Sequence, residues 1–90
     1  MAGYRVLIKP SAAKEIGAIG AKKDRQRIVA RILALADESR PVGCEKLAGV
    51  EGHYRVRQGQ FRVVYAINEA SHTVEVVKVG HRREVHRGTT

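Results

Sequence analysis

Two kinds of hydrophobic pattern follow each other along this chain. Residues 4–9 (YRVLIK) favour a strand, which ends at Pro10 because proline cannot donate to a sheet. Ser11 can then cap a helix that glycines end near Gly20. From about Lys23 to Asp37, apolar residues recur every three or four positions, as on one face of a second helix. This apolar stripe consists of Ile28, Val29, Ile32, Leu33, Leu35 and Ala36.

The second half of the chain alternates between apolar and polar residues, which is typical of strands. Residues 39–52 contain Pro41 and three glycines and predict a connecting loop. The stretch HYRVRQGQFRVVYAI (53–67) predicts a β-hairpin around Gly59-Gln60, and TVEVVKV (73–79) predicts a further strand. The inward positions of the hairpin are Tyr54, Val56, Phe61, Val63, Tyr65 and Ile67.

The order of these elements is β-α-α-β-β-β. It predicts one α+β domain over residues 1–90, with two N-terminal helices packed on one face of a small antiparallel sheet. The first strand is expected to join the same sheet. No internal repeat or linker divides the chain.

The predicted hairpin gathers arginines on the sheet face that the helices leave open. A two-residue turn places Arg57 opposite Arg62, and Arg55 opposite Val64. Like charges that face each other across strands are destabilising, but the same register pairs the core residues Val56 and Val63. Guanidinium groups bind phosphate through two parallel hydrogen bonds, so the face is a candidate phosphate site. The alternative is a solvated basic face without a ligand.

Charge and composition narrow the possible partners. The chain has 17 Lys and Arg against 9 Asp and Glu, a net charge of +8, which favours nucleic acid or the ribosome over an anionic membrane. It has neither a signal-peptide pattern nor an apolar run long enough to span a bilayer, so we expect a cytoplasmic protein. The single Cys44 excludes an intramolecular disulfide and fits a reducing compartment. No cluster of metal-ligating residues is evident, and we expect no metal or cofactor.

The C-terminal residues form a second basic group, which contains histidines. It consists of His81, Arg82, Arg83, His86 and Arg87. Histidine exchanges protons near neutral pH, and RNA supplies its own nucleophile, the 2′-hydroxyl. Cations that stabilise the phosphorane, together with a base and an acid, are sufficient for cleavage without a metal.

The quoted motifs resemble those of a known family. KLAG (46–49), the hairpin and VEVVKVGHRREVHR (74–87) together resemble the RelE branch of the RelE/ParE toxin superfamily over nearly the whole chain. The resemblance implies the β-α-α-β-β-β fold and a ribosome-dependent endoribonuclease that cuts messenger RNA in the ribosomal A site without a metal. It also implies a cognate RelB-like antitoxin that neutralises the toxin in a hetero-oligomer.

The resemblance also implies roles for individual residues. Arg55 and Arg57 would contact the RNA backbone and assist deprotonation of the 2′-hydroxyl, and Arg62 would stabilise the transition-state phosphate. Arg82 would support the leaving group. The family commonly has Val-Tyr where this chain has Val85-His86, so His86 is expected to stack on a base and to carry protons. The expected catalytic set is Arg57, Arg62, Arg82 and His86, and the expected RNA-binding set is Arg55, Arg83 and Arg87.

Some alternatives remain open at this point. Arginine stays protonated, so His86 is the leading candidate for the base; Glu45 is second, because YoeB-like toxins place a carboxylate in the corresponding loop. A ParE-like toxin would share the fold but inhibit DNA gyrase. A non-catalytic RNA-binding homologue would keep the arginines and would have no need of His86.

Overall fold

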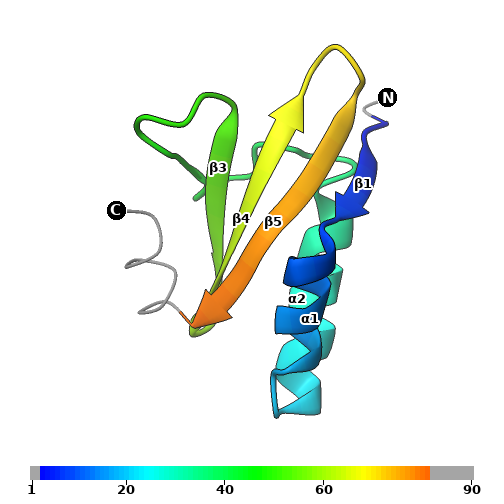
Figure 1. Cartoon of the computed structure of the whole chain (residues 1–90), viewed down its shortest axis with the longest axis vertical. Helices are drawn as coiled ribbons and strands as arrows, with labels where there is room; N and C mark the ends of the chain where they lie inside the picture. Colours follow the sequence, from blue (N-terminus) through cyan, green and yellow to red (C-terminus); the bar gives the residue numbers. More distant parts are fainter. Residues whose placement is uncertain (1–2, 82–90) are drawn as a thin grey trace.

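A computed structural model of the protein describes residues 3–81, which form two helices and one five-stranded sheet (Figure 1). The elements are β1 (Arg5–Ile8), α1 (Pro10–Gly17), α2 (Lys22–Ala34), β2 (Glu45–Lys46), β3 (His53–Gln58), β4 (Phe61–Asn68) and β5 (Thr73–His81). The predicted α+β fold with two N-terminal helices is confirmed. Within this part of the chain, no helix is long and apolar enough to cross a membrane.

The two helices lie side by side and pack on one face of the sheet (Figure 1). Pro10 occupies the first turn of α1, where its missing N–H is not needed, so the helix begins one residue before the predicted cap at Ser11. It ends at Gly17, earlier than predicted, because the chain turns before α2 begins at Lys22. α2 ends at Ala34, three residues before the predicted Asp37.

The predicted apolar stripe of the second helix is narrower in the structure. Ile28 and Ile32, together with Leu35 just beyond the helix, are fully buried. Val29 and Leu33, in contrast, have 38% and 59% of their surface exposed. The stripe therefore contributes to the core only along its centre.

The sheet has the strand order β1-β5-β4-β3-β2. The β3–β4 hairpin has the predicted register, with Val56 opposite Val63 and Arg57 opposite Arg62. The sequence predicts an antiparallel sheet, but β1 pairs with β5 in parallel, so one of the strand pairs differs from the prediction. A parallel pair needs a long crossover, and the helices and the rest of the sheet provide it between the first and the last strand.

The loop expected at residues 39–52 contains a short additional strand. β2, only two residues long, pairs antiparallel with β3 and places Glu45 opposite Arg55. It covers the edge of β3 that would otherwise be unpaired. This addition brings the loop to the arginine-bearing face.

The core lies between the helices and the sheet. Of the predicted inward residues of the hairpin, Val56, Val63, Tyr65 and Ile67 are buried, and Tyr54 and Phe61 are partly buried against them. The buried hydroxyl of Tyr65 donates to the carbonyl oxygen of Ser39 at 2.7 Å and thereby anchors the loop that leads to β2.

Candidate functional site

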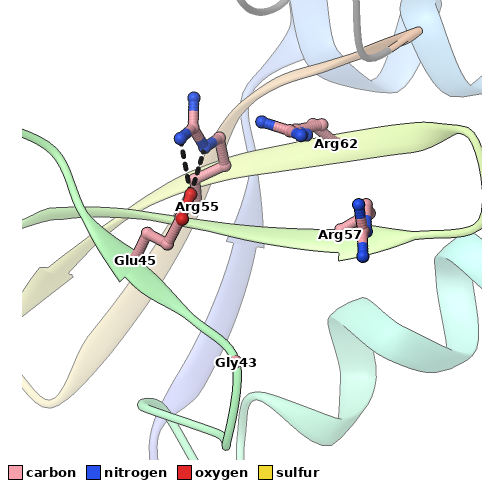
Figure 2. Close-up of a pocket in the computed structure, with 5 residues that line it drawn as sticks. All are labelled: Gly43, Glu45, Arg55, Arg57 and Arg62. Atoms are coloured by element: carbon pink, nitrogen blue, oxygen red, sulfur yellow. Dashed lines mark hydrogen bonds and ion pairs between the residues drawn. The ribbon is translucent and has the colours of Figure 1, made fainter.

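Three arginines, Arg55, Arg57 and Arg62, surround a cavity of about 170 Å³ on the sheet face opposite the helices (Figure 2). We call them the arginine cluster. Arg55 and Arg57 belong to β3 and Arg62 to β4, where they alternate with core residues and therefore point to the other face. The remaining lining residues are Gly43, in the segment that leads into β2, and Glu45, the first residue of β2.

Arg55 is held by Glu45. Its Nε and Nη2 atoms both donate to Oε1 of Glu45, at 3.1 and 2.5 Å (Figure 2). The Arg55 side chain is 17% exposed, whereas that of Glu45 is 62% exposed. The hydrogen bonds from Arg55 lower the pKa of the Glu45 carboxyl below its ordinary value, and the charges of Arg55, Arg62 and Arg57 lower it further.

The other two arginines keep donors available for an anion. Arg57 is exposed, and the buried Nε of Arg62 has no hydrogen-bond partner within residues 3–81. In Figure 2 the Arg62 side chain extends towards Arg55, while the guanidinium of Arg57 stands apart from both. Three cationic side chains against one carboxylate leave the cavity with a net charge of +2. A cavity of this charge and size suits a phosphate group.

The structure brings together the arginines that were predicted to share one face. The other predicted site residues, Arg82, Arg83, His86 and Arg87, lie outside the described residues.

His81, in contrast, does not lie on the arginine-bearing face. Its ring lies 5.9 Å from that of Phe61, edge to face at 74°. Phe61 packs against the core, so His81 lies on the helix side of the sheet, away from the arginine cluster. Although His81 belongs to the second basic group of the sequence, it therefore does not join the arginine cluster.

Sequence reasoning missed the contact between Glu45 and Arg55. The sequence indicates Glu45 only as a second candidate base, within a predicted loop. No alternation in the sequence could have found it, because β2 has only two residues and its pairing with β3 appears only in the structure. As held here, Glu45 is a weaker base than an ordinary glutamate, because its pKa is lowered.

The sequence of the chain matches a known family over most of its length. The family model, described as the ParE toxin of the type II toxin-antitoxin system parDE, matches residues 6–86. The chain belongs to this toxin family. The prediction of a toxin from a type II toxin-antitoxin system is thus confirmed.

Individual relatives are RelE proteins. Toxin RelE of Mycobacterium tuberculosis is 27% identical over 84 residues, which cover 93% of this chain and 87% of the relative. The toxin fold also matches an archaeal RelE-RelB complex from Pyrococcus horikoshii with a TM-score of 0.78 and 28% identity, over 91% of this chain and 97% of that one. The isolated RelE toxin of E. coli, at 21% identity, shares the fold with a TM-score of 0.76 over 94% and 98% of the two chains. The predicted membership of the RelE branch is confirmed by these similarities.

Proposed function

We propose that this toxin is a ribosome-dependent endoribonuclease that cleaves messenger RNA through the RNA 2′-hydroxyl and so inhibits translation. The arginine cluster is the observation that carries the proposal. Its side chains are presented by paired strands around a cavity of net positive charge, and two of the three arginines have no acidic partner among the described residues. A scissile phosphate, whose negative charge increases in the transition state, is the ligand that this arrangement suits best.

In the proposed reaction the 2′-oxygen attacks the adjacent phosphorus and the 5′-oxygen leaves. Arg57 and Arg62 stabilise the charge of the phosphorane, and Arg82 supports the leaving 5′-oxygen. Arginine remains protonated, so a different group must remove the 2′ proton, and we assign this step to His86. The same residue or water then protonates the 5′-oxygen.

The remaining basic residues are proposed to hold the RNA backbone, and an acidic partner to cover them. Arg55, Arg83 and Arg87 are the proposed RNA contacts. The relative from Pyrococcus horikoshii was solved as a RelE-RelB complex, and we propose that a RelB-like antitoxin neutralises this toxin in a hetero-oligomer. A net charge of +8 favours binding of an acidic segment across the basic face. Because the proposed target is the ribosome, we propose that the toxin acts in the cytoplasm.

Cleavage of messenger RNA on programmed ribosomes tests the proposal. Primer extension should detect A-site cuts with the unaltered toxin and lose them with Arg62→Ala and with His86→Ala. Arg27→Ala, at an exposed position of α2, is the control for loss of one positive charge and should cut normally. Circular dichroism should show that all variants are folded. Cuts that persist in Arg62→Ala would contradict the role of the arginine cluster.

A second candidate function is inhibition of DNA gyrase. The matching family model carries the description of ParE toxins, and this observation favours it. A supercoiling assay with the purified toxin separates the two functions, because an endoribonuclease leaves gyrase unaffected. Inhibition of supercoiling without cuts in messenger RNA would establish the second function in place of the first.

A further inference from the structure

We propose that Glu45 is a built-in competitor of the RNA phosphate: its carboxylate holds Arg55 in the unbound toxin, and a bound phosphate group takes its place. The inference rests on the proposed function, since the phosphate concerned is that of the RNA backbone. It gives the cavity two alternative anions, one supplied by the chain and one by the substrate.

The geometry of the contact supports an exchange of anions. Arg55 uses two adjacent donors, Nε and Nη2, for the single oxygen Oε1 of Glu45. These two donors form one edge of the guanidinium fork, which binds two phosphate oxygens equally well. A phosphate that binds this edge must therefore displace the carboxylate.

The burial of the two side chains shows which of them moves. Arg55 is largely covered, at 17% exposed, and it belongs to a strand that is paired on both sides. Glu45 is 62% exposed and belongs to a strand of only two residues at the edge of the sheet. Its carboxylate can turn into water with little loss of packing. The arginine remains at the site and the carboxylate leaves it.

The electrostatics explain why an acid at this position is useful before RNA binds. Arg57 and Arg62 face each other directly, with Arg55 on the same face of β3. Like charges at such spacing destabilise the sheet. One carboxylate among them offsets part of the repulsion in the unbound protein. The same carboxylate opposes the binding of any other anion, so stability and RNA affinity depend on it in opposite directions.

A second glutamate provides a matched control. Glu69 also forms an exposed ion pair with an arginine, Arg40, at 2.7 Å. It follows β4 at the end remote from Arg62, seven positions along the chain or roughly 23 Å at the usual rise of a strand. Glu45→Gln and Glu69→Gln each change the net charge from +8 to +9. Only the first removes the carboxylate from the cavity.

The experiment measures RNA affinity and stability on the same protein samples. The probe is a fluorescent RNA hexamer with 2′-O-methyl groups, which cannot be cut because its nucleophile is blocked. Fluorescence anisotropy gives its affinity for the full-length toxin and for the Glu45→Gln, Glu69→Gln and Arg62→Ala variants. Thermal unfolding without RNA gives the midpoint temperatures.

We expect Glu45→Gln to bind the hexamer about two- to fivefold more tightly than Glu69→Gln does, the size expected for one exposed ion pair. Its midpoint temperature should fall below that of the unaltered toxin. Arg62→Ala should bind more weakly. In the ribosome assay, the Glu45→Gln variant at saturating concentration should still cut messenger RNA, because the proposed competitor takes no part in the chemistry. If Glu45 were the general base, the same substitution would abolish the cuts.

The outcomes separate failure of this inference from failure of the proposed function. If Glu45→Gln binds the hexamer as tightly as Glu69→Gln, or more weakly, the inference about Glu45 is overturned. The phosphate site is still supported in that case, provided that Arg62→Ala weakens binding. Hexamer binding that Arg62→Ala leaves unchanged would overturn both, because the arginine cluster would not be where RNA binds.

Discussion

The direct opposition of Arg57 and Arg62 leads to a quantitative prediction: the toxin should become more stable when one of the two charges is removed. The change is Arg57→Gln, which keeps a long polar side chain on an exposed position of β3. The register of the hairpin leaves the two arginines no other placement, since Val56 and Val63 pair in the core beside them.

The size of the gain follows from the geometry. Like charges directly opposite in a sheet cost about 0.2–1 kcal/mol. The guanidinium of Arg57 stands apart from that of Arg62 in Figure 2, so we expect a value in the lower part of this range, about 0.2–0.5 kcal/mol. For a domain of this size, 1 kcal/mol shifts the midpoint temperature by about 4–8 °C, and the expected gain is about 1–4 °C. The gain should shrink in about 1 M salt, where the Debye length is only about 3 Å.

Thermal unfolding of four proteins provides the measurement: the unaltered toxin, Arg57→Gln, Arg62→Gln and the double variant. The double-mutant cycle isolates the repulsion between the two residues from their other contacts. Arg27→Gln on α2 controls for the loss of one positive charge from the whole chain. The A-site cuts should weaken in Arg57→Gln while stability increases. A variant no more stable than Arg27→Gln, or a gain unchanged at high salt, would refute the reasoning.

Three further predictions concern the frame that supports the site. Tyr65→Phe removes a donor and leaves the Ser39 carbonyl without it, so it should lower the free energy of unfolding by about 1–3 kcal/mol in urea titrations. Gly52→Ala should destabilise by about 1–3 kcal/mol in the same assay, because Gly52 has a φ of +76° and an added Cβ would meet a backbone oxygen at 3.3 Å. Hydrogen bonds from Tyr4 and Arg40 lower the pKa of Glu69 below its ordinary value of 4.5. The difference in stability between the unaltered toxin and Glu69→Gln should therefore be complete above pH 4.5 and disappear as the pH falls through the lowered pKa. A difference that persists in acid would contradict this prediction.

The hairpin could be predicted from the sequence in detail because its own residues determine it. Alternation of Val56 and Val63 with arginines decides which face is buried, and the two-residue Gly59-Gln60 turn then sets the register. Residue preferences were less reliable for predicting where the helices end, because the course of the chain between the helices also determines those ends. α1 stops at Gly17 and not near Gly20, since residues 18–21 are needed for the turn into α2.

Two features of the sheet could not be predicted because they depend on long-range contacts. The residues of β1 show that it is a strand, but not that it pairs with β5 in parallel about 68 positions away. β2 is too short for periodicity to reveal it, and its pairing with β3 is what brings Glu45 to Arg55. The missed part of the candidate site therefore follows from the missed strand.

The core and the arginine cluster are coupled in this fold, because core residues and arginines are neighbours along β3 and β4: Val56 precedes Arg57, and Val63 follows Arg62. A one-residue shift of register that separated Arg57 from Arg62 would also turn Val56 and Val63 out of the core. Such a shift therefore cannot relieve the repulsion, whereas a counter-charge can. Glu45 supplies that charge from a short edge strand, where it is exposed enough to be exchanged. Because the arginines are fixed on paired strands and Glu45 is an exposed residue of the edge strand β2, control of RNA affinity is to be looked for at Glu45.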